Sequence, residues 1–251
     1  MKKIIFTILV GALVLTVSGI VSASMMIPAA DQAKEKSRAP ENSPVIGDNW
    51  DLERVDFIHY AKPASPGKPP KTETCYKLMG VKWTDLPVSY VINPTNSDGL
   101  GENFITSAIS VSAETWDNAT SKELFSNNYA VDYGVQYGVQ DYKNAIDFGN
   151  YSDANVIAVT SVWYTRVRKK IVEFDIRFDT DWTWGDATIA SSTMDFQNIA
   201  THELGHAVGL SDIYSTGCPS VTMYGYSGYG ETQKRTLEQP DITGLQVMYG
   251  I

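Results

Sequence analysis

The alternation of apolar and polar residues along this chain is most regular between residues 156 and 178. Residues 156–166 and 170–178 each repeat with a period of two, the period at which side chains of a β-strand point to opposite faces. The second segment alternates an apolar set with a mainly polar one, namely Val172, Phe174, Ile176 and Phe178 against Ile171, Glu173, Asp175 and Arg177. One face of this strand is therefore predicted to be buried and the other solvated, and residues 167–169 predict a hairpin.

Three other segments have apolar residues at the spacing of helices. Residues 102–118 have the pattern of an amphipathic helix, and residues 195–210 predict a second helix. Residues 239–249 predict a third, because Pro240 lies in its first turn and Gly250 follows its last residue.

Shorter apolar runs add strands around these elements. Residues 88–92 and 144–149 predict strands, and the tyrosine-rich residues 129–141 are ambiguous between a short strand and a loop. The order of strand, helix, several strands, helix, irregular loop and helix predicts an α+β domain. We expect one twisted sheet with a long helix packed beneath it.

The N-terminal residues have the pattern of an export signal. Lys2 and Lys3 precede an apolar run over residues 4–21, and Ala23 ends a small-x-small cleavage site. A cleaved signal peptide is predicted, with an uncleaved membrane anchor as the alternative because the run is long enough to span a bilayer. In both cases we expect the rest of the chain outside the cytoplasm, secreted or anchored to the cell envelope.

A proline-rich stretch over residues 62–71 is predicted to be a linker and marks the clearest domain boundary. The apolar content of residues 51–60 before it predicts a short strand or a docked segment. The predicted organisation is a signal peptide over residues 1–23, an N-terminal extension over residues 24–74 that is a candidate pro-region, and one folded domain over residues 75–251.

Charge and composition narrow the classes of function. The formal net charge of the chain is −9, and removal of Lys2 and Lys3 with the signal peptide takes it to −11. Nucleic acid is excluded as a partner because its binding needs a basic surface. The low density of charge and the aromatic content are those of a folded globule, which we expect to be a monomer.

The predicted second helix carries the sequence HELGHAVGLSD. His202 and His206 are four residues apart, so they share one face of a helix and can bind one metal ion. Glu203 is placed to act as the general base on water at that metal. The alternative is an amphipathic helix whose two histidines are core residues.

A third ligand is expected from the turn that follows this helix. Gly209 permits a sharp turn that would bring Asp212 back to the two histidines. Three protein ligands with one open position are typical of a catalytic zinc site. The alternative role of Asp212 is a helix-end or supporting carboxylate, and the only other histidine, His59, lies far upstream.

The chain has two cysteines, Cys75 and Cys218. Outside the cytoplasm a disulfide between them is expected. One alternative is that Cys75 is a thiolate that binds the zinc and keeps a zymogen inactive, and another is that the thiols are free or pair between molecules.

These motifs together resemble a known family. HELGHAVGLSD resembles the zinc signature of the metzincin peptidases, and VTMY over residues 221–224 resembles their Met-turn, in the Met-Tyr form of the matrixins. Residues 237–250 are similar to the end of matrixin catalytic domains, and residues 82–92 resemble their start. The resemblance covers about residues 75–251.

The resemblance implies a metzincin-like catalytic domain with a mixed sheet, an active-site helix and a Met-turn. Its zinc would lie at the floor of a cleft, with Met223 beneath it as an apolar base. A peptide would bind antiparallel to an edge strand over residues 155–163, and the tyrosines after the Met-turn would wall the primed side. The candidate substrate-binding residues are Ala158, Thr160, Tyr224 and Tyr226.

The sequence departs from the matrixin pattern in several respects. Asp212 replaces the usual histidine ligand, and histidines for a second, structural zinc are absent. Gly225 stands where some metzincins have a tyrosine that contacts the zinc. The family's thiol-switch motif is also absent. If residues 24–74 cover the cleft, His59 is the nearest possible ligand for the zinc, but the expectation for His59 is an exposed histidine. The candidate ligands for calcium are Asp179, Asp181 and Asp186. The alternative is that these are simply solvated loop carboxylates.

The predicted function is that of a secreted zinc endopeptidase acting on extended polypeptides. Zinc on His202, His206 and Asp212 would activate water, and Glu203 would take its proton. The alternatives are a non-catalytic surface protein that keeps zinc for stability, and a zinc hydrolase of a non-peptide envelope polymer. The expected partners are protein or peptide substrates, with no stable membrane association once the signal is cleaved.

Overall fold

The computed structural model describes residues 51–62 and 74–251. The predicted signal peptide, almost all of the predicted linker and residues 24–50 of the predicted extension lie outside these ranges. No helix within them combines the length and the apolar character that crossing a bilayer requires.

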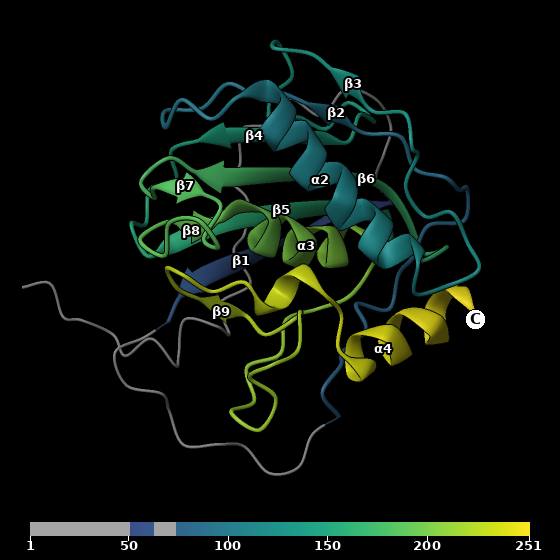
Figure 1. Ribbon diagram of the computed structural model, residues 1–251. Coiled ribbons are helices and arrows are strands. Elements are labelled where there is room, and N and C mark those ends of the chain that lie inside the picture. The colour runs from purple at the N-terminus through teal and green to yellow at the C-terminus, as the bar shows by residue number, and fades with distance from the viewer. Residues whose placement is uncertain (1–50, 63–73) are drawn as a thin grey trace, which may run out of the picture. The chain divides into compact units, whose positions relative to one another are not determined.

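A seven-stranded mixed sheet organises the described residues (Figure 1). Its order is β3-β2-β4-β6-β5-β1-β9. The strands are β1 (Leu52–Ala61), β2 (Val91–Ile92), β3 (Ala130–Val131), β4 (Ala145–Gly149), β5 (Val156–Thr165), β6 (Lys170–Asp179) and β9 (Tyr226–Ser227). β5 pairs antiparallel with β6 and with β1, whereas the other pairs in this sheet are parallel. A separate two-stranded ladder joins β7 (Trp184–Gly185) to β8 (Met194–Asp195).

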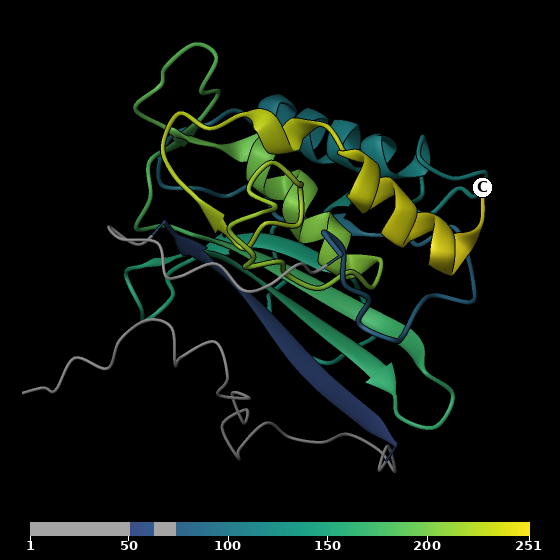
Figure 2. The same cartoon turned by 90° about the horizontal axis from the view of Figure 1, so that it is seen from below.

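Two packed helices, α2 (Glu102–Asp117) and α3 (Phe196–Ala207), lie on one face of this sheet (Figures 1 and 2). The indole Nε1 of Trp116 in α2 donates to Thr201 O in α3 at 2.8 Å. A 3-10 turn, η1 (Gln233–Arg235), and a last helix, α4 (Gln239–Tyr249), follow. The buried core between sheet and helices includes Ile105, Ile109, Trp116, Phe174, Phe178, Ile199 and Leu204. This arrangement confirms the predicted α+β architecture.

The boundaries of α3 follow from two residues at its ends. Asp195 caps the helix, because its carboxylate accepts a hydrogen bond from Asn198 N at 2.8 Å. The helix ends at Ala207, earlier than the predicted end at residue 210. Gly209 has a φ of +104°, and a Cβ there would lie 2.5 Å from Val81 O, so this turn requires glycine.

The predicted hairpin is confirmed, while one short strand is smaller than predicted. β5 and β6 pair antiparallel as far as Thr165 and Lys170. Of the predicted strand over residues 88–92, only β2 joins the sheet, and Val88 forms an isolated bridge to Phe125. The ambiguous residues 129–141 contain the short strand β3.

The prediction of a solvated face on β6 was wrong. Glu173 and Asp175 are fully buried because the loop before β4 covers them. Asp141 N and Tyr142 N donate to the carboxylate of Glu173, and Gly138 N and Ala145 N donate to that of Asp175. The two carboxylates thus replace water with backbone N–H groups, and burial raises the pKa of Asp175 to about 8.

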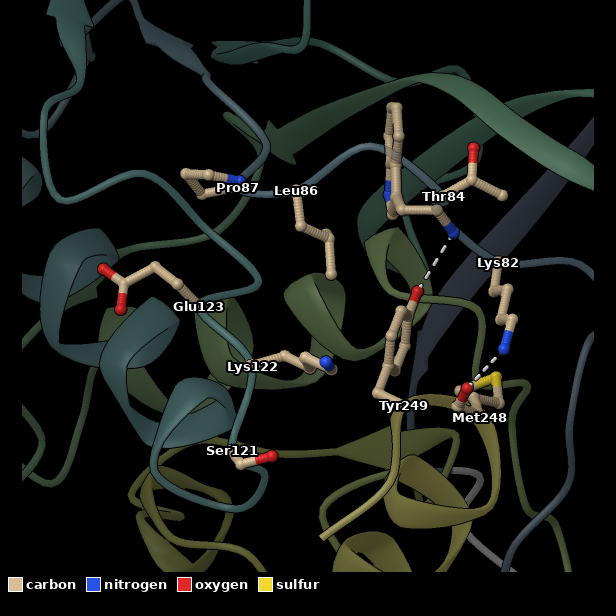
Figure 3. Close-up of a pocket in the computed structure, with 10 residues that line it drawn as sticks. Lys82, Thr84, Leu86, Pro87, Ser121, Lys122, Glu123, Met248 and Tyr249 are labelled. Atoms are coloured by element: carbon tan, nitrogen blue, oxygen red, sulfur yellow. Dashed lines mark hydrogen bonds between the residues drawn. The ribbon is translucent and has the colours of Figure 1, made fainter.

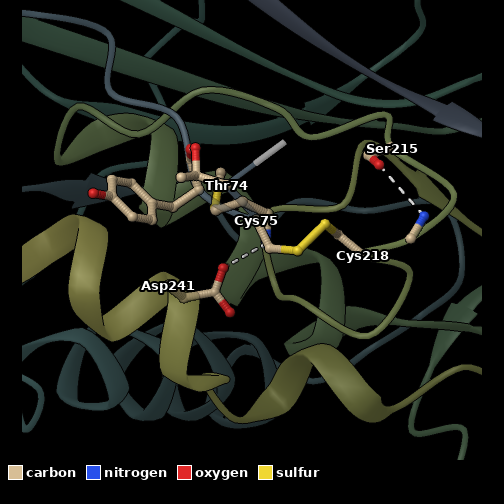
Figure 4. Close-up of a disulfide and its surroundings, with 8 residues drawn as sticks. Thr74, Cys75, Ser215, Cys218 and Asp241 are labelled. Atoms are coloured by element: carbon tan, nitrogen blue, oxygen red, sulfur yellow. Dashed lines mark hydrogen bonds between the residues drawn. A yellow bond between two sulfur atoms is a disulfide. The ribbon is translucent and has the colours of Figure 1, made fainter. Parts of the chain in front are cut away.

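A disulfide joins Cys75 to Cys218, as expected for an oxidising compartment (Figure 4). The two residues are 143 positions apart in sequence. The bridge ties the segment before β2 to the loop after α3, and closing so long a loop stabilises the fold by about 5 kcal/mol in the chain-entropy account. Both sulfur atoms are used in the bridge, so Cys75 is not a thiolate ligand.

Candidate active site

Three buried ligand atoms converge at the end of α3. His202 Nε2 and His206 Nε2 lie 3.1 Å apart, and Asp212 Oδ1 lies 3.2 Å from the first and 3.4 Å from the second. A tetrahedral zinc with bonds of about 2.0–2.1 Å separates its ligands by about 3.3 Å. Within the described residues, Asp212 Oδ1 has no hydrogen-bond partner, which leaves this oxygen available to bind a metal. The donor set therefore fits zinc.

The outer nitrogens of the two histidines are held by backbone carbonyls. His202 Nδ1 donates to Thr222 O at 2.7 Å, and His206 Nδ1 donates to Leu210 O at 2.9 Å. These bonds place the proton on Nδ1 and leave the Nε2 lone pairs directed to the common centre. Burial lowers the pKa of His202 to about 3, which keeps its ring neutral and ready to bind a metal.

Met223 packs against α3. A Cβ on Gly205, between the two histidines, would collide with the sulfur of Met223, so the close approach requires glycine. Asp241 at the start of α4 holds the turn, because its carboxylate accepts from Thr222 N at 2.8 Å and from Met223 N at 3.2 Å. The backbone of the predicted Met-turn is thus held beside α3, where Thr222 O accepts from His202 Nδ1.

Glu203 is fully buried beside the ligand atoms. Its Oε2 accepts a hydrogen bond from Thr160 Oγ1 at 2.5 Å, and its Oε1 lies 3.0 Å from His59 Nδ1. Burial raises the pKa of Glu203 to about 7. A carboxyl with a pKa near neutrality is suited to accept and return a proton.

The strand predicted to be the free edge of the cleft is not an edge. β1 pairs antiparallel with β5 from Leu52 opposite Thr165 to Tyr60 opposite Val156, with a shift in register between His59 and Tyr60. The end of β1 also pairs in parallel with β9, Tyr60 lying opposite Tyr226. Figure 2 shows β1, in dark blue, running beside β5. The N-terminal segment therefore occupies the place in which the resemblance puts a substrate.

Two side chains of β1 enter the site. Residues two apart in a strand share a face, so Phe57 and His59 point the same way. The ring of Phe57 stacks on His206 with centroids 4.1 Å apart, and the ring of His59 lies 3.9 Å from that of His202. His59 is fully buried, so the expectation of an exposed histidine was wrong.

His59 belongs to a second group of possible metal ligands, with His202 and Glu203. Both of its nitrogens already have partners, because Nδ1 faces Glu203 and Nε2 lies 3.1 Å from Lys234 Nζ. An ammonium beside Nε2 opposes a second cation there. The geometry therefore favours His202, His206 and Asp212 as the metal ligands, and His59 as a cap on Glu203.

Ala158 and Thr160 lie on β5 opposite the residues of β1 that enter the site. Ala158 pairs with His59, and Thr160 pairs with Phe57. Tyr224 and Tyr226 follow the Met-turn and direct their carbonyls to Lys234. Their predicted roles in substrate binding stay predictions, while their positions line the groove that β1 fills.

Three residues near the centre had no signal in the sequence, namely Tyr214, Ser227 and Lys234. Burial and the nearby Asp212 raise the pKa of the Tyr214 phenol well above its ordinary value. A Cβ at Gly225 would collide with the ring of Tyr214, so this tyrosine fills the space beside the turn. Lys234 is fully buried although it lies in a polar, irregular stretch of sequence.

The three candidate calcium ligands are not gathered into one site. Asp186 forms an ion pair with Arg235 at 2.7 Å, and Asp181 accepts a hydrogen bond from Asn150 at 3.2 Å. Asp179 accepts from Asp181 N at 3.0 Å. Calcium binding stays a prediction.

A separate open pocket of about 580 Å³ lies between the segment before β2 and the end of α4 (Figure 3). Its walls are joined by hydrogen bonds from Trp83 N to Tyr249 Oη at 3.1 Å and from Lys82 Nζ to Met248 O at 2.6 Å. None of the predicted site residues lines it, so it is no part of the candidate active site.

Comparison with known proteins places this geometry in context. The family model described as matrixin, peptidase M10, matches residues 82–250. Human matrilysin is 40% identical over 76 residues, which are 30% of this chain and 27% of that protein. The hatching enzyme of Paracentrotus lividus is 26% identical over 178 residues, 70% of this chain and 27% of the enzyme. Human matrix metalloproteinase-16 is 26% identical over 179 residues, 70% of this chain and 28% of that protein. The chain therefore spans less than a third of the length of each of these relatives.

Proposed function

This chain belongs to the matrixin family of peptidases, as its motifs predicted, and from that premise we propose that it is a secreted zinc-dependent endopeptidase. The observation that carries the proposal is the tetrahedral spacing of His202, His206 and Asp212 beside a buried Glu203. A structural zinc site needs no carboxyl base next to its ligands, so this arrangement favours catalysis over a stabilising role.

The proposed reaction is the addition of water to a peptide carbonyl. Bound zinc supplies a Lewis acid that polarises the carbonyl and makes water more acidic. Glu203 takes a proton from the attacking water and passes it to the nitrogen of the departing amine. The hydroxyl of Thr160 fixes Oε2 of Glu203, so Oε1 is the oxygen left to exchange the proton.

An extended peptide is the substrate that this groove fits. β5 offers its backbone to a partner strand, and β1 already shows such pairing, antiparallel to β5 and parallel to β9. A substrate in the place of β1 would use the same backbone groups beside Ala158, Thr160 and Tyr226, and would be recognised by strand addition. This pairing favours a polypeptide over a non-peptide polymer.

The same occupancy supports the proposal that residues 24–74 are an inhibitory pro-region. β1 fills the substrate position, and His59 Nδ1 donates to the one oxygen of Glu203 that Thr160 leaves free. The base and the groove are blocked together. Replacing Phe57 and His59 by alanine in the full chain should raise cleavage of casein, whereas an unchanged rate in that variant would contradict latency.

Export is proposed from the first residues of the chain. The charged start, apolar run and small residues before position 24 support a signal peptide. N-terminal sequencing of the exported protein should begin at Ser24. A protein that retains residues 1–23 in the envelope fraction would favour the membrane anchor instead.

The peptidase proposal is tested with the full chain and a chelator. Casein cleavage should stop when the metal is removed and return when one equivalent of zinc is added. The Phe57→Ala/His59→Ala variant provides the unblocked form for the same assay. Stoichiometric zinc without cleavage by this variant would refute the proposed activity.

A further inference from the structure

The imidazole of His59 is fully buried, and the space it fills, called here the His59 pocket, ends at two hydrogen-bond donors. His59 Nε2 lies 3.1 Å from Lys234 Nζ and 3.1 Å from Ser227 Oγ. All three side chains are fully buried. Nδ1 of His59 faces the carboxylate oxygen Oε1 of Glu203 at 3.0 Å. This Nδ1 donates to Glu203, and Nε2 therefore accepts.

Lys234 has one acceptor for each of its three N–H groups. Tyr224 O and Tyr226 O accept two of them, the second at 3.1 Å, and His59 Nε2 accepts the third. The two carbonyls belong to the wall of the groove and remain when β1 leaves. Withdrawal of His59 therefore leaves one N–H of Lys234 and the hydroxyl of Ser227 directed into the pocket without an acceptor.

Among the described residues no carboxylate forms an ion pair with Lys234, although Asp212, Glu231 and Glu203 act on its charge from a distance. Asp212 faces the metal position and Glu203 lies at the pocket's entrance, while Glu231 forms an ion pair with Lys62. A buried ammonium is costly unless an anion or several acceptors surround it. Burial lowers the pKa of Lys234 to about 7, and an anionic occupant would restore its charged form.

We propose that this pocket selects substrates whose side chain at the position of His59 is a hydrogen-bond acceptor, with the carboxylate of glutamate preferred. The inference rests on the proposed function, because it assigns the selectivity of the same groove. Lys234 is its main specificity-determining residue and Ser227 assists it. An apolar side chain would leave both donors buried and unpaired.

The length of the pocket distinguishes glutamate from aspartate. Nε2 of a histidine and the carboxylate oxygens of a glutamate are both four bonds from Cα, so glutamate reaches Lys234 and Ser227 as His59 does. Aspartate is one bond too short. Glutamine reaches equally far but brings no charge, so we expect the order of affinity Glu, then Gln, then Leu.

The strand itself supplies the probe for the test. Ten-residue synthetic peptides with the sequence of Leu52–Ala61, carrying Glu, Gln or Leu in place of His59, keep the register known from β1. They are titrated by calorimetry into the zinc-loaded full chain carrying Phe57→Ala, His59→Ala and Glu203→Gln, which frees the pocket and prevents turnover. We expect the Glu peptide to bind roughly tenfold or more tightly than the Leu peptide.

Two pocket variants show whether the donors cause the preference. Lys234→Met keeps the length of the side chain and should bring the Glu-to-Leu affinity ratio to about one, and Ser227→Ala should lower it by roughly threefold. A Leu peptide that binds as tightly as the Glu peptide would overturn the inference, as would a ratio unchanged by Lys234→Met. If Lys234→Met does not fold, the Glu-to-Leu affinity ratio of the parent chain and its change in Ser227→Ala decide whether the inference holds.

Cleavage separates the inference from the function on which it rests. The same peptides are incubated with the Phe57→Ala/His59→Ala chain that keeps Glu203. Cleavage without preference for Glu would overturn the inference alone. No cleavage of any peptide, with zinc bound, would overturn the proposed peptidase, while the binding ratio still decides the selectivity of the pocket.

Discussion

Replacing His59 by alanine should loosen β1 and unblock the groove. The imidazole is fully buried and contacts the site through both nitrogens, to Glu203 at 3.0 Å and to Lys234 at 3.1 Å. Alanine removes both bonds and the ring contact with His202, whose centroid lies 3.9 Å away. The contacts of Phe57 with His206 stay in place.

The magnitude follows from these contacts. A hydrogen bond to a charged partner contributes about 1.5–3 kcal/mol, and two such bonds are lost. Water entering the vacated space recovers part of this, which leaves a net loss of about 3 kcal/mol. Since about 1.4 kcal/mol corresponds to a factor of ten, the population with β1 detached should rise roughly a hundredfold.

The assay is amide hydrogen exchange of residues 52–61 in the full chain, read by mass spectrometry. The amides of β1 should exchange roughly a hundredfold faster in His59→Ala, and casein cleavage should rise in parallel. Ile58→Ala is the matched control, because Ile58 lies on the same strand but on the opposite face. If His59→Ala and Ile58→Ala loosen β1 equally, the side chain of His59 does not hold the strand, and the reasoning is refuted.

Further predictions concern residues around the site and in the fold. Thr160→Val should lower kcat about tenfold with zinc content unchanged, because Glu203 loses the hydrogen bond that fixes its Oε2. Metal analysis and peptide kinetics on the unblocked chain check this prediction, and a loss of zinc would contradict it. Asp241→Ala should reduce the free energy of unfolding by about 2–4 kcal/mol, because Thr222 N and Met223 N lose their acceptor. Urea unfolding measures this change, and Asp241→Asn is the milder control. Burial raises the pKa of Asp175 to about 8 from an unfolded value of about 4, so its stabilising contribution is complete below pH ~4 and is lost as the pH rises to about 8. The stability of the protein relative to Asp175→Asn, measured in urea at matched pH, should therefore fall over that range, and a constant difference would contradict the assignment.

Local spacing made much of the fold predictable. His202 and His206 share a helix face whatever the rest of the chain does, and Gly209 marks the turn that ends the helix. The hairpin over residues 156–178 follows from its period of two, and Pro240 marks the first turn of α4. Each of these depends on residues close together in sequence.

The features that escaped prediction depend on contacts between distant segments. Glu173 and Asp175 have the pattern of a solvated face, yet a loop buries them and donates backbone N–H groups to their carboxylates. His59 meets Glu203 across 144 positions, and Lys234 meets His59 across 175. No periodicity records such contacts, so the blocked groove and its cationic end could be found only from the structure.

Catalysis by a metal centre with Glu203 as its base is tested by Glu203→Gln in the unblocked Phe57→Ala/His59→Ala chain. Zinc content and casein cleavage are measured on the same sample, beside the parent that keeps Glu203. We expect one zinc per chain in both and cleavage only by the parent. Cleavage by the Gln variant at the rate of the parent would contradict the role of Glu203, and zinc-loaded parent protein that cleaves nothing would contradict the peptidase itself.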